Sequence, residues 1–223
     1  MFRIKICGVR SRHDVVAVAE AGADAVGFNF FPRSVRYISP REASQISANI
    51  PRGIAKVGVF VNSPVGEIRE IAFRVGLHWI QLHGDETPDF LVKLRPLNCI
   101  KAFRIGPGGL DPVRQFLNDC EKLNVIPSGV LLDAAQDGEY GGTGQTFDWN
   151  VVTEYRRISP AAPPLILSGG LNPENVAQAV QAVRPAAVDV ASGVEDAPGK
   201  KSPEKIKLFV AAAKAAWEAI KGD

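Results

Sequence analysis

Cysteine is scarce in this sequence of 223 residues, which contains only Cys7, Cys99 and Cys120. An odd number of cysteines without paired spacing neither cross-links a secreted fold nor forms a metal cluster, so we expect a reducing compartment. The sequence also lacks an apolar run of transmembrane length, and its first residues, M-F-R-I-K-I-C-G, show no basic segment followed by a long apolar one. These absences predict a soluble cytoplasmic protein.

An excess of one charge is missing as well. The 26 lysines and arginines stand against 24 aspartates and glutamates, and the basic residues do not gather into runs. This balance gives no reason to expect a nucleic acid or a membrane as partner, and a small molecule is the expected ligand. The spacing of the His, Cys, Asp and Glu residues resembles no metal site, so no metal is expected.

What the sequence does contain is a regular alternation of short strand-like runs with longer segments of helical period. The expected strands are 3–7, 25–31, 55–61, 79–83, 99–104, 129–133, 164–168 and 187–191. The expected helices are 11–21, 40–49, 64–75, 87–95, 110–123, 148–157, 174–183 and 203–220. Eight strand-then-helix units in one domain, 1–223, predict an α/β fold closed into a single (β/α)₈ barrel. An open doubly wound sheet is the alternative, and the absence of G-x-G-x-x-G after the first strand argues against its nucleotide-binding form.

Alternate side chains of a barrel strand point inward and outward, which separates each strand into two sets. One set is apolar and is expected to face the helices: Ile4, Ile6, Val26, Phe28, Ile80, Leu82, Ile100, Leu132, Val188 and Val190. The other set is polar and is expected to face the barrel axis: Lys5, Cys7, Asn29, Gln81, His83, Lys101, Asp133 and Asp189. Buried charges are costly unless paired, and two lysines and two aspartates can compensate one another. We therefore interpret the polar set as the interior of an active site.

Two glycine-containing turns follow the last two expected strands. Ser168-Gly169-Gly170 ends the seventh strand, and Asn172 is placed to cap the helix that Pro173 begins. Ala191-Ser192-Gly193 ends the eighth strand in a similar way. Glycines allow a close approach of the backbone, and a helix N-terminus favours anions. Because (β/α)₈ barrels build phosphate sites at these two strand ends, the pattern predicts a phosphate site.

Cys7 and Asp133 are the candidates for proton transfer, since each ends an expected strand on the catalytic side of the barrel. Cys7 is either a small buried hydrophobic residue or a functional thiol whose thiolate Lys5 favours. Asp133 is either a loop cap or partner of Lys101, or a carboxylic acid kept protonated by desolvation. The two strands lie almost opposite each other, which would make them an acid–base pair.

The loops add further candidates. Arg33 and Arg36 follow the second strand, and a guanidinium over the barrel mouth suits a substrate carboxylate. His83 either hydrogen-bonds a substrate or is structural. The glycine-rich segment 134–146 is long for a spacer, so we expect a lid or binding loop there.

Taken together, the motifs strongly resemble the phosphoribosylanthranilate isomerase family of tryptophan biosynthesis. They are K-I-C-G-V-R (5–10), D-A-V-G-F-N-F-F-P-R-S-V-R-Y-I-S-P (24–40), V-G-V-F-V-N (57–62), Q-L-H-G (81–84), Y-G-G-T-G-Q-T-F-D-W (140–149), L-S-G-G-L-N-P-E-N-V (167–176) and V-D-V-A-S-G-V-E (188–195). The resemblance spans the chain and implies an Amadori rearrangement of N-(5′-phosphoribosyl)anthranilate without a cofactor.

By the same resemblance, Cys7 is the general base, Asp133 the general acid, and Arg36 the residue that holds the anthranilate carboxylate. The phosphate falls on Gly169, Gly170, Ser192 and Gly193, with Gly141, Gly142 and Gly144 beside them. Asp133 would protonate the furanose ring oxygen, and Cys7 would then take the C2′ proton of the resulting iminium. This requires the pKa of Asp133 to be raised and that of Cys7 to be lowered.

Three questions stay open at the level of the sequence. A Schiff-base lyase that uses Lys5 or Lys101 is one alternative, and a phosphate-ligand binding module without turnover is another. The sequence does not distinguish a monomer from a homodimer. The Arg36 contact and the lack of a second phosphate clamp weigh against a histidine-pathway substrate.

Overall fold

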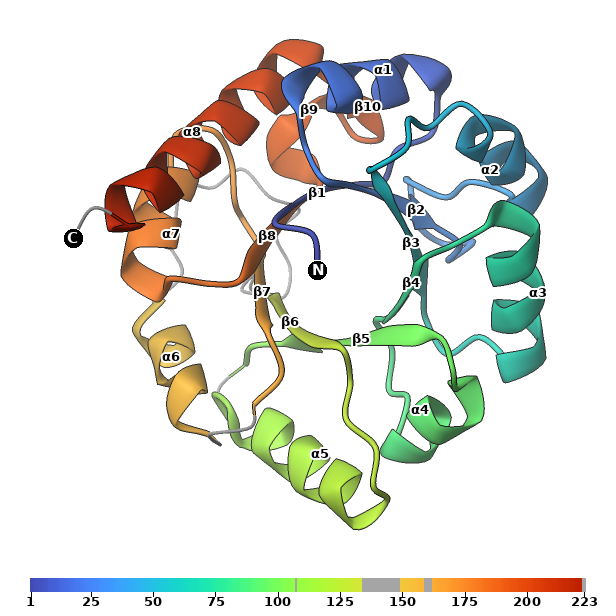
Figure 1. Cartoon of the computed structure of the whole chain (residues 1–223), viewed down its shortest axis with the longest axis vertical. Coiled ribbons are helices and arrows are strands. Elements are labelled where there is room, and N and C mark those ends of the chain that lie inside the picture. Colours follow the sequence, from blue (N-terminus) through green and yellow to red (C-terminus); the bar gives the residue numbers. More distant parts are fainter. Residues whose placement is uncertain (107, 134–148, 159–161, 222–223) are drawn as a thin grey trace.

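The computed structural model of the chain describes residues 1–106, 108–133, 149–158 and 162–221. Eight parallel strands form a closed barrel in the order of the sequence, so the predicted (β/α)₈ architecture is confirmed (Figure 1). The strands are β1 Ile4–Cys7, β2 Ala25–Asn29, β3 Ala55–Phe60, β4 Trp79–Leu82, β5 Asn98–Arg104, β6 Gly129–Asp133, β7 Leu165–Ser168 and β8 Ala187–Val190. β1 closes the barrel because Lys5 lies in register with Ala25 of β2 on one side and with Asp189 of β8 on the other.

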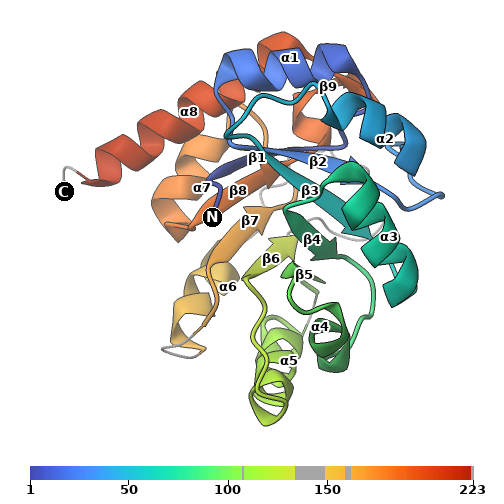
Figure 2. The same ribbon diagram turned by 45° about the vertical axis from the view of Figure 1, so that its right-hand side comes forward.

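The helices lie around the outside of the strands (Figures 1 and 2). They are α1 Arg12–Ala21, α2 Pro40–Ser47, α3 Val65–Val75, α4 Pro88–Leu94, α5 Asp111–Lys122, α6 Trp149–Thr153, α7 Val176–Val183 and α8 Pro203–Lys221. Local sequence fixes several of their ends. Ser11 and Ser39 form capping boxes with Asp14 and Glu42, and Gly22 ends α1 in the left-handed conformation. In the described part of the chain, none of the helices is both long and apolar enough to cross a bilayer.

Apolar side chains form two separate layers. The larger layer lies between the strands and the helices, and it contains Ile4, Ile6, Val26, Phe28, Leu132 and Val188 as strand parity predicts. The smaller layer fills the N-terminal part of the barrel interior. It consists of Phe2, Ala25, Val57, Ile100, Ala102, Leu131, Ile166 and Ala187. The polar set therefore begins one layer above this apolar floor.

The predicted parity is wrong for β5. Ile100 and Ala102 belong to the interior layer, so Lys101, between them, points toward the helices. Its ammonium group is satisfied there, donating to the Gly84 carbonyl oxygen at 2.5 Å and to Glu86 Oε2 at 3.0 Å. The side of the strand that faces the helices was expected to be apolar. Lys101 can lie on that side because its charge is compensated by the buried ion pair with Glu86.

Other differences concern short elements. The helix expected at 174–183 begins at Val176, because the side chain of Asn172 accepts hydrogen bonds from the backbone N–H groups of Glu174 and Asn175 and forms a turn first. The helix expected at 148–157 is divided into α6 and the 3₁₀ helix η1, Glu154–Arg157. After β8, the chain adds the 3₁₀ helix η2, Ser192–Val194, and a hairpin of β9, Glu195–Ala197, and β10, Lys200–Lys201. This hairpin is not among the elements expected from the sequence.

Candidate active site

A cavity of about 760 Å³ opens at the C-terminal ends of the strands. Its size is that of a small-molecule site. The residues that line it include Arg36, Arg104, Asp133, Ser168, Gly169, Gly170, Asp189, Ser192 and Glu195. The structure thus brings together the predicted acid, the predicted arginine and both turns of the predicted phosphate site. Gly141, Gly142 and Gly144, with the rest of the expected lid at 134–146, lie outside the described residues.

Cys7 lies at the end of β1, with 8% of its surface exposed. Its register partner in β2 is Gly27, where an added Cβ would lie 2.9 Å from Cys7 Sγ and 3.0 Å from Lys5 Cε. Gly27 therefore leaves the room in which the thiol and the lysine meet. Lys5 is fully buried and donates from Nζ to Asp189 Oδ1 at 2.8 Å, and its charge favours the thiolate of Cys7.

Burial dominates the electrostatics of this thiol. It raises the pKa of Cys7 above its ordinary value, although Lys5 and Lys201 favour the thiolate. The predicted lowering of this pKa is therefore wrong for this arrangement. For Lys5 the balance is the reverse. Burial lowers its pKa, but the charge of Asp189 and the hydrogen bond to it outweigh burial and hold the pKa above its ordinary value.

Asp133 ends β6 and lies near His83, which follows β4. His83 Nε2 is 3.7 Å from Asp133 Oδ2, and His83 Nδ1 is 3.1 Å from the side-chain amide nitrogen of Gln81. His83 also lines a second cavity, of about 690 Å³, which shares Arg104 with the first. His83 thus lies beside the candidate acid.

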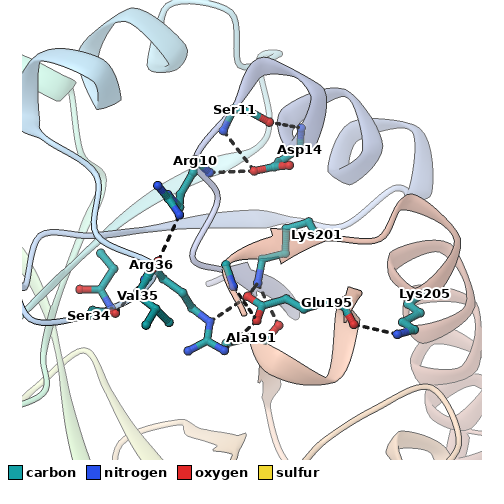
Figure 3. A network of polar contacts seen from close by, with 12 residues as sticks. Arg10, Ser11, Asp14, Ser34, Val35, Arg36, Ala191, Glu195, Lys201 and Lys205 are labelled. Carbon is teal, nitrogen blue, oxygen red and sulfur yellow. Dashed lines mark hydrogen bonds and ion pairs between the residues drawn. The ribbon is translucent and has the colours of Figure 1, made fainter. Parts of the chain in front are cut away.

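Arg36, in the loop after β2, forms a two-point ion pair with Glu195 of β9 (Figure 3). Its Nε and Nη2 donate to the two carboxylate oxygens at 2.8 and 2.7 Å, and these hydrogen bonds raise the pKa of Arg36. Glu195 is a site residue that is not among those expected from the sequence. The available signal was its place directly after the glycine-containing turn, at the end of V-D-V-A-S-G-V-E.

The two glycine-containing turns pack tightly against each other. Gly169 and Gly170 have φ values of 90° and 64°, which favour glycine. A Cβ on Gly193 would lie 1.9 Å from the Leu171 carbonyl oxygen, so only glycine fits there. The N–H groups of Glu174 and Asn175 already donate to the side chain of Asn172. We therefore expect an anion to bind at the glycines of the turn and not at those two N–H groups.

Within the described residues, no three His, Cys, Asp or Glu side chains are grouped so that they could hold a metal ion.

Comparison with known proteins connects this geometry to an enzyme family. A family model described as N-(5′-phosphoribosyl)anthranilate (PRA) isomerase matches residues 4–212. The chain is 46% identical over 215 residues to the N-(5′-phosphoribosyl)anthranilate isomerase of Thermotoga neapolitana, covering 96% of this chain and 99% of the relative. It is 42% identical over 216 residues to that of Geobacter metallireducens, covering 96% and 100%.

Solved structures agree with these matches. The chain resembles the crystal structure of phosphoribosyl anthranilate isomerase from Thermotoga maritima, with a TM-score of 0.83 and 43% identity over 96% of this chain and 100% of the other. It also resembles a phosphoribosyl anthranilate isomerase in complex with reduced 1-(o-carboxyphenylamino)-1-deoxyribulose 5-phosphate, with a TM-score of 0.80, 41% identity and coverage of 96% and 100%.

Proposed function

Since this chain belongs to the family of N-(5′-phosphoribosyl)anthranilate isomerases, we propose that it catalyses the Amadori rearrangement of N-(5′-phosphoribosyl)anthranilate to 1-(2-carboxyphenylamino)-1-deoxyribulose 5-phosphate, with Asp133 as general acid and Cys7 as general base. The observation that carries the assignment of residues is the cavity shared by Arg36, Asp133, Gly169, Gly170 and Ser192. Cys7 ends β1 next to Gly8, over which the Arg36 side chain lies. A carboxylated aminosugar phosphate needs an arginine for its carboxylate, an acid and a base for proton transfer, and glycine-containing turns for its phosphate.

The reaction has two proton transfers. Asp133 gives its proton to the furanose ring oxygen, the bond from that oxygen to C1′ breaks, and the nitrogen lone pair forms an iminium. Cys7 then removes the C2′ proton, and the electrons of that bond form an enolamine, which tautomerises to the ketone. General acid–base catalysis of this kind contributes roughly 10²–10⁴ per step.

The electrostatics of Cys7 limit when it can act as the base. Its raised pKa leaves the thiol protonated in the free protein, so the thiol must lose its proton to solvent before the thiolate can accept the C2′ proton. The iminium formed in the first step places a positive charge next to the thiol, which favours that loss. Lys5, held by Asp189, supplies a second fixed positive charge below the thiol.

We assign phosphate binding to the turns at Gly169-Gly170 and Ser192-Gly193. The turns join the cavity from neighbouring strands, and their glycines admit a phosphate close to backbone N–H groups. Gly141, Gly142 and Gly144 are assigned to the same phosphate from family resemblance alone.

Neither of the two lysines proposed for the Schiff-base alternative is a suitable amine. A Schiff base needs a neutral amine that reaches the substrate, whereas Lys5 is fully buried, is paired with Asp189, and has a raised pKa. Lys101 lies outside the barrel, paired with Glu86. Neither of the two candidate lysines meets the requirement.

The test follows turnover and binding separately. Phosphoribosylanthranilate is generated in situ, and its loss is followed by its fluorescence. We expect Cys7→Ser and Asp133→Asn each to lower kcat by at least 10²-fold, since each removes one proton-transfer step. Affinity for the reduced product analogue should change little, because both substitutions preserve shape.

Cys120→Ala is the matched control, since Cys120 is buried in α5, away from the cavity. It should keep wild-type turnover. Wild-type turnover in either Cys7→Ser or Asp133→Asn would refute the assigned roles. Binding of the analogue without turnover by the unmodified protein would favour a binding module instead.

A further inference from the structure

Contacts within the protein hold the loop that carries Arg36 in place without a substrate. The backbone N–H of Arg36 donates to Ser34 Oγ at 3.1 Å, and Arg10 Nη1 donates to the Val35 carbonyl oxygen at 3.1 Å. Gly8, at φ 77°, lies under the side chain, and a Cβ there would come within 2.7 Å of Arg36 Cδ. The arginine therefore lies across a glycine at the end of β1, next to Cys7.

Glu195 fixes the far end of this side chain (Figure 3). Its side chain is 4% exposed, and its carboxylate accepts four hydrogen bonds. Oε1 accepts from Arg36 Nε at 2.8 Å and from Lys201 Nζ at 2.7 Å. Oε2 accepts from Arg36 Nη2 at 2.7 Å and from the Gly199 N–H at 3.1 Å. Although burial raises the pKa of Glu195, the hydrogen bonds from Arg36 and Lys201 outweigh it and hold the pKa below its ordinary value.

This pairing uses only one edge of the guanidinium. A guanidinium has five N–H groups, and the side-on pair with Glu195 takes the Nε–H and one Nη2–H. Two N–H groups of Nη1 and one of Nη2 remain. These form the terminal edge, which can still bind a second carboxylate at two points. The Arg36 side chain is 19% exposed and lines the cavity, so a substrate can reach it.

Lys201 determines the net charge of the cluster formed by Arg36, Glu195 and Lys201. An Arg36–Glu195 pair alone would be neutral and would attract a substrate carboxylate only weakly. Lys201, 1% exposed in its side chain, lies on the other side of Glu195 with Nζ 2.7 Å from Oε1. Burial lowers the pKa of Lys201, and the hydrogen bond to Glu195 opposes that lowering. With Lys201 protonated, two cations and one anion leave a net charge of +1. Glu195 can therefore hold Arg36 without cancelling the charge that the substrate requires.

The same residues connect this group to the phosphate turn. Glu195 directly follows η2, which contains Ser192 and Gly193, and Lys201 Nζ also donates to the Ala191 carbonyl oxygen at 2.9 Å. The hairpin of β9 and β10 thus holds Arg36 at a fixed position relative to the turn assigned to the phosphate.

On these grounds we propose that Glu195 and Lys201 are positioning residues that make Arg36 selective for the carboxylate of the substrate. Glu195 aims the terminal edge of Arg36 into the cavity, and Lys201 preserves its net positive charge. The proposal rests on the proposed function, because it assumes that Arg36 receives the anthranilate carboxylate.

The test measures dissociation constants for two reduced phosphosugar analogues, one with an ortho-carboxyphenyl group and one with a phenyl group in its place. We expect Glu195→Gln and Lys201→Met each to weaken the carboxylated analogue at least tenfold, and to change the phenyl analogue less than twofold. Lys200→Met is the matched control, since Lys200 is an exposed residue of the same hairpin, and it should change neither.

Arg36→Met shows whether the effect passes through the arginine. In that background, Glu195→Gln should cause no further loss for the carboxylated analogue. Tighter or unchanged binding of the carboxylated analogue to Glu195→Gln would overturn the proposal, because Glu195 would then only compete with the substrate. If Glu195→Gln does not fold, Lys201→Met decides by the same criteria. Failure of the wild-type protein to bind either analogue would instead contradict the proposed function.

Discussion

The thiol of Cys7 sets the pH dependence expected at the scale of single residues. Burial raises its pKa, so the thiolate should form at a higher pH than the value of about 8.5 of a free cysteine. Cys99 and Cys120 have pKa values raised by burial to about 12 and about 11, so they contribute little absorbance near pH 9. Thiolate absorbance at 240 nm, with Cys7→Ser subtracted, should give a midpoint above 8.5.

The same titration of thiolate absorbance in Lys5→Met provides a second measurement. Lys5 favours the thiolate and also neutralises Asp189, so its removal should move the midpoint further upward. A midpoint below 8.5 in the wild type, or a downward shift in Lys5→Met, would contradict the electrostatic account of the site.

Single residues differed in how far the sequence could predict them. Cys7, Arg36 and Asp133 could be placed because each ends a strand or follows one, and strand ends meet at one face of a barrel. The prediction that Lys101 faces the barrel axis is wrong. Its partner Glu86 lies in a loop, and the periodicity of the sequence does not predict where a loop runs. The role of Glu195 depends on contact with Arg36, which is 159 positions away in the chain.

At the scale of elements, the close packing of the two glycine-containing turns predicts the effect of Gly193→Ala. The new Cβ would lie 1.9 Å from the Leu171 carbonyl oxygen, a backbone atom that cannot rotate away. The turns must then separate. We expect at least a tenfold loss of affinity for the reduced product analogue and a lower Tm, measured by titration and by thermal unfolding.

Gly66→Ala is the control for this substitution. Gly66 lies in α3 with open space around the position of its Cβ, and alanine stabilises helices relative to glycine by roughly 0.5–1 kcal/mol. It should leave affinity unchanged and raise Tm slightly. Equal affinity in Gly193→Ala and Gly66→Ala would show that the packing of the turns does not shape the site.

Strands and helices could be predicted from the sequence where their hydrophobic periodicity extends over enough residues. Strands of four or more residues and amphipathic helices gave clear periodicity, whereas β9 and β10 contain three and two residues. No alternating pattern can be recognised over such lengths. Glu195 and Lys201 lie in register in this hairpin and form a buried ion pair, a contact that periodicity does not report.

For the whole molecule, the buried thiols predict a loss of stability in alkaline solution. The unfolded chain ionises Cys99 and Cys120 near pH 8.5, while burial raises their pKa values in the folded state to about 12 and about 11. Above pH 8.5 the folded state therefore binds more protons than the unfolded state. The free energy of unfolding should then decrease as pH rises toward the folded pKa values.

Urea unfolding at several values between pH 8 and 10.5 measures this decrease. Lysines and tyrosines contribute to it in every variant, so the relevant quantity is the difference from Cys99→Ala/Cys120→Ala. The double variant is expected to be less stable at pH 8 because of the cavities it creates, and to lose less stability per pH unit. The same slope in both proteins would rule out these thiols as the cause.

The apolar floor inside the barrel, formed by Phe2, Ile100, Leu131 and their neighbours, also limits traffic through the enzyme. It closes the N-terminal end of the barrel, so in the part of the chain that the structure describes the cavity with Arg36 and Asp133 opens where the strands finish. Substrate and product would then use the same opening in turn. We therefore expect the release of product, as well as the chemical steps, to contribute to the time of each turnover.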